Sequence, residues 1–425
     1  MKRVRLVSLL LVLVVIVSGI ALAQDEKVLV VGHAEVTDSL DPARGYTQTV
    51  GIINHVTYEN LVTFPESDSS AILPELATDW TVSEDGLTYT FNLRDDVVFA
   101  NGDPLTADDV VFTANRLKYI QGSPSFLASN IASVVADDED TVTFTLSEVN
   151  PAFLTNLANN AFGIVNADVV REQGGTDAED AAAVDTAEEY LNSTSAGTGP
   201  YVLESWEPQV ETVLVRNENY WGDAPYFDRI IIQNISEAAT QKTALEAGDI
   251  DLATDLTPDQ LVTMRDNPDL TVASSLGNIV HFLLMNQSAA QCGPTADPLV
   301  QEAVRNALDY EGYIALWGGV TPAGPTGVLT NYGFETTPTR DLDRARELLA
   351  EAGYPDGLAL TLEYPVYTAQ GVNMDTNAQK IQSDLAEAGI TVTLDPGDVG
   401  VQLQEYRTAR QCFAYWFWGP DSLDV

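Results

Sequence analysis

Hydrophobic and polar residues alternate with a period of two in two segments of the chain, residues 80–94 and 133–146. Each segment is interrupted by a turn rich in Asp, Glu or Gly, so each is predicted to form a β-hairpin. The same alternation predicts a hairpin over residues 201–217, and the apolar run of residues 28–32 predicts a buried strand. Short strands joined by polar turns are therefore expected to make up much of residues 72–193.

A helix is predicted directly after the first hairpin. Thr106 is followed three residues later by Asp109, a variant of the capping box with which helices begin. One side of this helix is apolar and is formed by Val110, Val111, Ala114 and Leu117. A further helix-like segment covers about residues 49–61.

From residue 281 onward, helices alternate with strands. Residues 341–366 and 377–396 each contain a helix that ends in Ala-Gly and a strand that follows it. Glycine ends helices readily because it adopts left-handed backbone angles, and this alternation predicts an α/β fold. Residues 172–196 are acidic and rich in Ala, so a surface helix or loop at a domain boundary is expected there. A last apolar strand is predicted over residues 412–419.

The N-terminus has the features of a cleaved signal peptide. Three basic residues precede an apolar stretch, residues 6–22, which ends in the small-x-small sequence Ala-Leu-Ala at residue 23. A membrane anchor is the alternative, but the polar residues that follow at once favour cleavage. We expect export to the periplasm or to the extracellular face of the cell envelope, without a lipid anchor, because no lipobox cysteine follows the apolar stretch.

The chain is strongly acidic. Its net charge of −43 becomes −46 without residues 1–23, which carry three basic residues and no acidic one. Such a surface repels nucleic acid and anionic membranes, so neither is expected as a partner.

Residues that carry redox, metal or catalytic chemistry are few. A disulfide between Cys292 and Cys412 and two separate thiols both fit the sequence, because spacing does not supply bond geometry. His33, His55 and His281 lie in no metal-ligand spacing, and neither a nucleophile elbow nor a phosphate-binding loop is present. We therefore expect no metal, no cofactor and no catalytic residues, and we predict a protein that is not an enzyme.

Residues 77–102 read ATDWTVSEDGLTYTFNLRDDVVFANG. This run resembles the signature of the family 5 extracellular solute-binding proteins of ABC transporters, of the peptide-binding type. Further matches occur in family order and span nearly the whole mature chain: SLDP at 39–42, GTGPY at 197–201, RNALDYEGYI at 305–314, RARELLAEAGYPDG at 344–357, SDLAEAGI at 383–390 and WGPDSLD at 418–424.

The resemblance implies an α/β, two-lobed fold like that of periplasmic binding proteins, with three subdomains and a ligand cleft between the lobes. Residues 24–71 and 194–280 are expected to form the core of lobe I, residues 72–193 its small subdomain, and residues 281–425 lobe II. Members of the family continue further, so lobe II is expected to be incomplete at its C-terminus.

The resemblance also implies ligand-binding residues near the end of the chain. In peptide-binding relatives, the aspartate three residues after a tryptophan holds the α-ammonium group of the ligand, and Asp421 has that position. A solvated terminal aspartate is the alternative. Strand alternation is expected to turn Trp418, or else Trp416, toward the cleft as an aromatic wall and Phe417 toward the core.

Two more segments are implied in the cleft. The segment after the SLDP motif binds the main chain of extended peptides in relatives, in the manner of strand addition. In this chain it contains Tyr46, Thr47 and Gln48, and core packing is the alternative for the tyrosine. Phe126 is expected to reach in from the small subdomain. Gly197 and Gly199 are expected to act as a hinge because glycine adopts backbone angles that other residues cannot, although an ordinary tight turn is the alternative.

These expectations lead to one functional hypothesis. The chain is expected to be the substrate-binding protein of an ABC importer, a monomer that captures dipeptides or oligopeptides and delivers them to a permease and its ATPase. Oligosaccharides and metal chelates are the alternative ligands within this family. An extracellular hydrolase is the alternative from another class.

Overall fold

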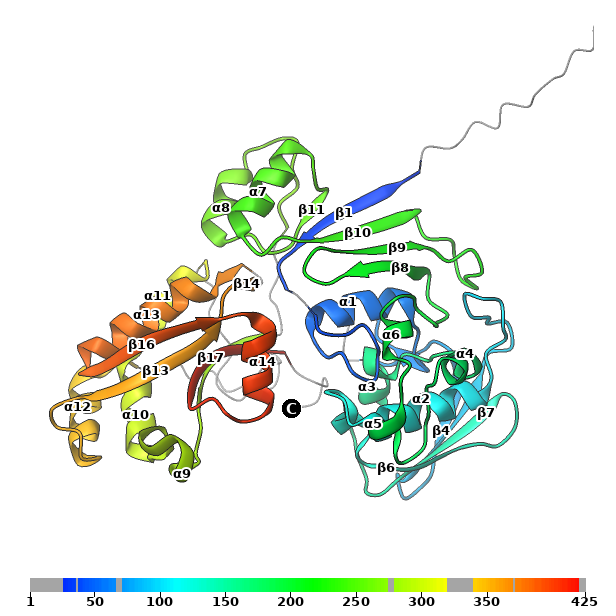
Figure 1. The fold of residues 1–425 in the computed structure, drawn as a ribbon, viewed down its shortest axis with the longest axis horizontal. Coiled ribbons are helices and arrows are strands. Elements are labelled where there is room, and N and C mark those ends of the chain that lie inside the picture. The colour runs from blue at the N-terminus through cyan, green and yellow to red at the C-terminus, as the bar shows by residue number, and fades with distance from the viewer. Residues whose placement is uncertain are drawn as a thin grey trace, which may run out of the picture.

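The computed structural model describes residues 26–35, 37–65, 71–273, 279–318, 339–369 and 371–419. These residues form two bodies, lobe I and lobe II, which lie beside each other in Figure 1. Lobe I contains two sheets of four or five strands, and lobe II contains one sheet of four strands. The fold is therefore α/β and two-lobed, as the sequence predicted.

The core sheet of lobe I has the strand order β11-β1-β10-β9-β8. β1 pairs in parallel with β10 and β11, while β8, β9 and β10 form an antiparallel ladder that includes the predicted hairpin. Apolar residues of this sheet and of helix α1 share one hydrophobic cluster. The bounds are β1 Val28–His33, α1 Gln48–Thr57, β8 Tyr201–Glu207, β9 Glu211–Arg216, β10 Arg229–Asn234 and β11 Leu252–Ala253.

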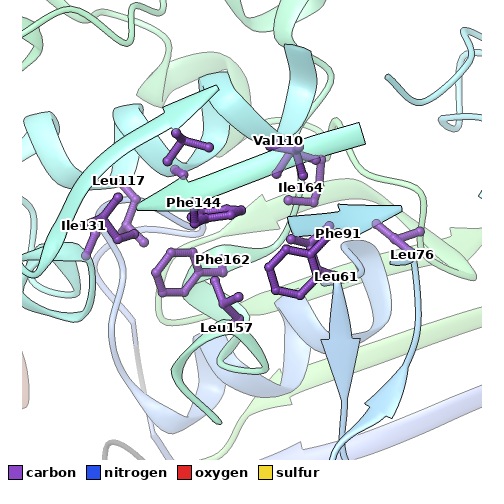
Figure 2. Packing of buried hydrophobic residues seen from close by; sticks show 14 of the residues in the cluster. Leu61, Leu76, Phe91, Val110, Leu117, Ile131, Phe144, Leu157, Phe162 and Ile164 are labelled. Carbon is purple, nitrogen blue, oxygen red and sulfur yellow. The ribbon is translucent and has the colours of Figure 1, made fainter. Parts of the chain in front are cut away.

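The small subdomain of lobe I contains both other predicted hairpins in one antiparallel sheet of order β4-β5-β7-β6. Helix α2 (Ala107–Ile120) covers this sheet and begins with the predicted capping box, in which Asp109 Oδ2 accepts the N–H of Thr106 at 2.9 Å. Figure 2 shows Phe91 and Phe144 of the sheet packed with Val110 and Leu117 of the helix. The strands are β4 Ala77–Val82, β5 Thr88–Leu93, β6 Ile131–Ala136 and β7 Thr141–Leu146, with the short pair β2 Val62–Thr63 and β3 Leu73–Pro74 beside them.

The acidic, Ala-rich segment at residues 172–196 was expected on the surface, and this expectation is wrong in part. The segment contains short helices, and its apolar side chains Ala181, Ala187 and Leu191 are fully buried. Its Asp185 side chain is also fully buried, because it is paired with an arginine of α2. The short helices of residues 153–191 are α3 Phe153–Leu157, α4 Ala167–Glu172, α5 Ala181–Val184 and α6 Glu188–Leu191.

Lobe II is built on the sheet order β12-β17-β13-β16, in which β13 and β16 are parallel and β12 and β17 antiparallel. The two predicted helix-Ala-Gly-strand units are present. Gly353 and Gly389, just beyond the ends of α12 and α13, have φ of +94° and +92°, the left-handed conformation expected of glycine there. The strands are β12 Val280–Met285, β13 Leu358–Pro365, β14 Thr368–Ala369, β15 Val372–Asn373, β16 Ile390–Gly397 and β17 Phe413–Trp418. The helices are α9 Ala289–Cys292, α10 Pro298–Ala307, α11 Tyr310–Leu316, α12 Leu342–Glu351, α13 Met374–Glu387 and α14 Val399–Arg407.

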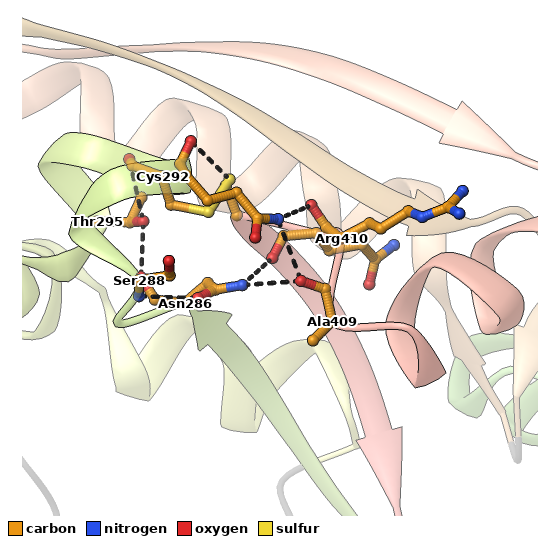
Figure 3. Close-up of a disulfide and its surroundings, with 9 residues drawn as sticks. Asn286, Ser288, Cys292, Thr295, Ala409 and Arg410 are labelled. Atoms are coloured by element: carbon orange, nitrogen blue, oxygen red, sulfur yellow. Dashed lines mark hydrogen bonds between the residues drawn. A yellow bond between two sulfur atoms is a disulfide. The ribbon is translucent and has the colours of Figure 1, made fainter.

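A disulfide joins Cys292, at the end of α9, to Cys412, the residue before β17. The sequence left this pairing open. Figure 3 shows that side-chain amides hold the turn beside the disulfide. Asn286 Nδ2 donates to the carbonyl oxygens of Ala409 and Gln411, both at 3.1 Å. The start of β17 is therefore fixed both covalently and by hydrogen bonds.

Helices α7 (Ala238–Ala247) and α8 (Pro258–Met264) follow β10 and β11, and the chain then continues to β12 of lobe II. No helix within the described ranges has the length and apolar character needed to cross a membrane.

Candidate functional site

A cavity of about 260 Å³ lies between the two lobes. Lobe I supplies Glu35, residues 45–48, one face of α1 and residues 159–161 to its wall. Lobe II supplies Tyr367, two apolar residues of α14 and residues 416–419. The wall therefore combines an amide-rich side from lobe I with an aromatic side from lobe II.

The segment that enters the cavity from lobe I is a tight turn followed by the start of α1. The main-chain carbonyl of Asp41 accepts the N–H groups of Arg44 and Gly45, both at 2.9 Å. Thr47 then caps α1 by accepting the N–H of Val50. This turn places residues 46–48 in the cavity wall, as the resemblance implied.

A buried ion-pair network anchors this turn. The Arg116 guanidinium of α2 donates to both carboxylate oxygens of Asp41 at 2.7 Å, and to those of Asp185 at 2.8 and 2.9 Å. The side chain of Arg116 is 2% exposed, and both carboxylates are fully buried. Burial alone would raise the pKa of Asp185, but Arg116 outweighs that effect and the pKa is lowered. Through these charge-assisted hydrogen bonds, the two aspartates and Arg116 hold the turn against the small subdomain.

The aromatic side of the cavity is carried by β17. Trp416 and Trp418 share one face of the strand, where both pack with Tyr406 of α14 at ring distances of 5.2 and 6.0 Å. Phe417 belongs to the buried core of lobe II, as the alternation predicted, but it also contributes to the cavity wall. Both tryptophans contribute to the cavity wall, whereas the sequence favoured Trp418 alone.

Direct contacts join the lobes at the edge of the cavity. Arg407 at the end of α14 forms an ion pair with Asp38 at 3.2 Å and donates to the main-chain carbonyl of Tyr46 at 3.1 Å. The Tyr46 ring lies 6.3 Å from that of Trp418 and 5.7 Å from that of Phe126. Phe126 is 48% exposed and is not part of the cavity wall, so it reaches the cleft only through Tyr46.

The wall also contains the carboxyl group of Glu35, which lies just after β1. Its Oε2 accepts the N–H and the hydroxyl of Thr49 at 2.8 and 2.9 Å. Burial raises the pKa of Glu35, and the hydrogen bonds from Thr49 oppose this rise. Close behind it, His33 pairs with Asp255 at 3.3 Å. Burial lowers the pKa of His33, but Asp255 outweighs it and the net shift is upward.

Gly197 and Gly199 lie within lobe I, directly before β8. Neither has a positive φ. They are instead packed so closely on the end of α1 that added Cβ atoms would lie 2.2 Å from the carbonyl oxygen of Thr57 and 2.6 Å from that of Val56. Close packing thus requires glycine at both positions, and their role as a hinge stays a prediction.

Asp421, the residue predicted to bind an α-ammonium group, lies outside the described residues. Most residues of the cavity wall were not predicted, and the polar ones among them include Glu35, Asn54 and Tyr367. Asn54 follows Thr47 and Gly51 at helical spacing, so the sequence could have predicted that it shares their face of α1. No local sequence pattern marks Glu35 and Tyr367 as residues of the wall, because they lie in different lobes and come together only in the folded protein.

The arrangement suits binding. Aromatic side chains bury apolar parts of a ligand, and amide and carboxylate groups fix its polar parts. Within the part of the chain that the structure describes, no group of three or more His, Cys, Asp or Glu side chains is placed to hold a metal ion.

Comparison with known proteins gives consistent matches. The model of the bacterial extracellular solute-binding proteins, family 5 (middle), matches residues 71–425. The chain is 30% identical over 414 residues to the probable D,D-dipeptide-binding periplasmic protein DdpA of Escherichia coli, covering 95% of this chain and 76% of that protein. It is 27% identical to di/tripeptide-binding protein 2 of Pseudomonas aeruginosa, covering 97% and 80%.

Solved structures agree with these matches. The fold superposes with a TM-score of 0.81 on the ABC transporter-associated periplasmic binding protein DppA of Helicobacter pylori in complex with the peptide STSA. The two chains are 27% identical, and the match covers 94% of this chain and 80% of that one.

Proposed function

The chain belongs to the bacterial extracellular solute-binding proteins of family 5, and on that premise we propose that it captures short peptides and delivers them to the permease of an ABC importer. The main support for this proposal is the cavity between the lobes, whose wall combines residues 46–48 with the aromatic side of β17. A relative named for D,D-dipeptides and a structural match that holds a tetrapeptide support peptides as the ligand class.

The cavity favours a small ligand. Its volume of about 260 Å³ lies just below the range of about 300–1,000 Å³ that is usual for small-molecule sites. The aromatic side provides contacts for side chains, and the turn after the SLDP motif offers main-chain groups to an extended peptide. If most of the binding energy comes from contacts with the peptide main chain, the protein should bind peptides with many different side chains.

The test is identification of the ligand and measurement of its binding. Native mass spectrometry of protein purified without denaturation is expected to show bound peptide, and calorimetry is expected to show binding of short synthetic peptides. A bound oligosaccharide or metal chelate, with no affinity for any peptide of two to five residues, would contradict the proposal. Cleavage products in the same incubations would support the hydrolase alternative.

Asp421→Asn is expected to weaken peptide binding by about 2 kcal/mol, because the substitution removes the charge that pairs with the α-ammonium group. Calorimetry with a free and an N-acetylated form of one peptide is the measurement. The free peptide should lose affinity in the variant, whereas the acetylated peptide should bind both proteins equally. Equal binding of the free peptide to both proteins would remove Asp421 from the site.

A further inference from the structure

Asn54 is an unusual residue of the cavity wall. It lies inside α1, the residue is 2% exposed, and it belongs to the wall of the cavity between the lobes. Among the described residues, neither its Nδ2 nor its Oδ1 has a hydrogen-bond partner. A buried amide with both polar atoms unpaired is rare in folded proteins.

With Asn54 at this position, α1 is less stable than it would be with an apolar residue in its place. Leaving a buried donor or acceptor unpaired costs about 1–3 kcal/mol, and asparagine is a poor residue for a helix interior. The neighbouring polar groups are already engaged. Asn160 Nδ2 donates to the carbonyl of Gly51 at 2.8 Å, and the Asn159 side chain accepts the N–H of Ala161 at 3.0 Å. The carboxamide of Asn54 thus stays unpaired in the wall of the cavity.

The face of α1 one turn before Asn54 leaves room for a ligand backbone. Gly51 lies one turn before Asn54 on the same face of α1 and also lines the cavity. A Cβ added at Gly51 would meet only Asn160 Nδ2, at 3.5 Å, so nothing else crowds that side of the helix. A chain can therefore approach α1 at this point.

A carboxamide presents a donor and an acceptor side by side. One residue of an extended peptide presents its own N–H and C=O on the same edge, as a strand does toward its neighbour. We propose that Asn54 is a ligand-binding residue that pairs with the main chain of one peptide residue, with Nδ2 donating to its C=O and Oδ1 accepting its N–H. This inference rests on the proposed function. It adds a residue that binds the main chain of the peptide irrespective of the side chains that the peptide carries.

The test uses Asn54→Leu in the full chain and the tightest-binding peptide from a set of alanine peptides two to five residues long. Leucine has a similar shape and removes both polar atoms, so the variant is expected to be at least as stable as the wild type. Its affinity for the peptide is expected to fall about tenfold or more, the loss typical of one or two hydrogen bonds. A substitution at a residue with only a structural role is not expected to preserve or raise stability while it lowers peptide affinity.

A series of peptides, each N-methylated at one amide, identifies the bonded residue. Methylation at that residue should weaken binding to the wild type but have little further effect on Asn54→Leu. Asn130→Leu is the matched control: its amide nitrogen is also buried and unpaired, but it does not line the cavity, so its affinity should be unchanged.

Three results would overturn the inference. Unchanged affinity in Asn54→Leu removes the residue from the site. A parallel loss of affinity and stability, with the same methylation pattern in both proteins, assigns it a structural role. If the wild type binds none of the peptides, the proposed function fails and this inference fails with it, whereas peptide binding that is insensitive to Asn54→Leu overturns this inference alone.

Discussion

Arg116→Met is expected to lower the free energy of unfolding by about 3–5 kcal/mol, the usual cost of removing one partner from a buried ion pair. The guanidinium satisfies two fully buried carboxylates, those of Asp41 and Asp185, through four hydrogen bonds of 2.7–2.9 Å. Without it, the two buried carboxylates keep only the longer ion pairs with Arg44, at 3.4 Å from Asp41 and 3.3 Å from Asp185. Arg116→Lys is expected to recover only part of the loss, because an ammonium group cannot bond both carboxylates in the forked geometry.

Urea denaturation of the wild type and the variants is the measurement. Arg344→Met is the matched control, since Arg344 is an exposed arginine that also bonds two acidic residues, Glu347 and Glu351. Its loss should change stability by no more than about 1 kcal/mol. If Arg116→Met were as stable as Arg344→Met, the network would not hold the turn of residues 39–48.

A functional consequence accompanies this loss of stability. Asp41 belongs to the turn that places residues 46–48 in the cavity wall. When its partner is removed, the turn loses its anchor to α2, so peptide affinity should fall in Arg116→Met even at temperatures where the protein stays folded. Affinity should be unaffected in Arg344→Met, because that arginine lies on the exposed side of α12.

The elements that the sequence predicted well are those specified by local patterns. Period-two alternation located the hairpins of lobe I, and the Thr106–Asp109 capping box located the start of α2. Gly353 and Gly389 marked the ends of two helices. Each of these signals depends on residues a few positions apart, so no knowledge of the tertiary structure was needed.

The buried network shows why other features escaped prediction. Asp185 lies in a segment so rich in acidic residues that a solvated position was the natural expectation. Its partner Arg116 is 69 positions away, and nothing in the spacing marks one aspartate among its acidic neighbours as buried. Long-range charge pairing depends on how the segments pack, and a single sequence does not contain that information in readable form.

The candidate site likewise contains residues that the sequence predicted and residues that depend on how the lobes pack. The resemblance, together with strand alternation, predicted residues 46–48 and Trp418 as site residues, and the structure places them in the wall of one cavity. Glu35 and Tyr367 come from different lobes and meet only through the arrangement of the lobes. Asn54 was readable in principle, because an amide stands at helical spacing from Thr47 and Gly51, but an isolated asparagine in a helix is too common to be singled out.

Removing the disulfide between Cys292 and Cys412 is expected to reduce the stability of lobe II by about 5 kcal/mol, the chain-entropy value for a loop of this size. The two cysteines are 120 residues apart, and this loop contains most of lobe II. The variant is Cys292→Ser/Cys412→Ser, compared with the wild type under oxidising and reducing conditions. Hydrogen exchange resolved by segment is the measurement, because it reports on each lobe separately.

Protection should fall in β13, β16 and β17 of lobe II, while β5 and β7 of lobe I serve as the internal control and should not change. Peptide affinity should fall as well, because Cys412 directly precedes the strand that carries Trp416 and Trp418 into the cavity. The amide hydrogen bonds of Asn286 to the turn before β17 remain in the variant, so β17 should loosen at its start and stay paired with β12. Reductant should affect the wild type and leave the double variant unchanged. Equal protection of lobe II in both proteins would mean that those amide bonds, and not the disulfide, hold the aromatic side of the cavity in place.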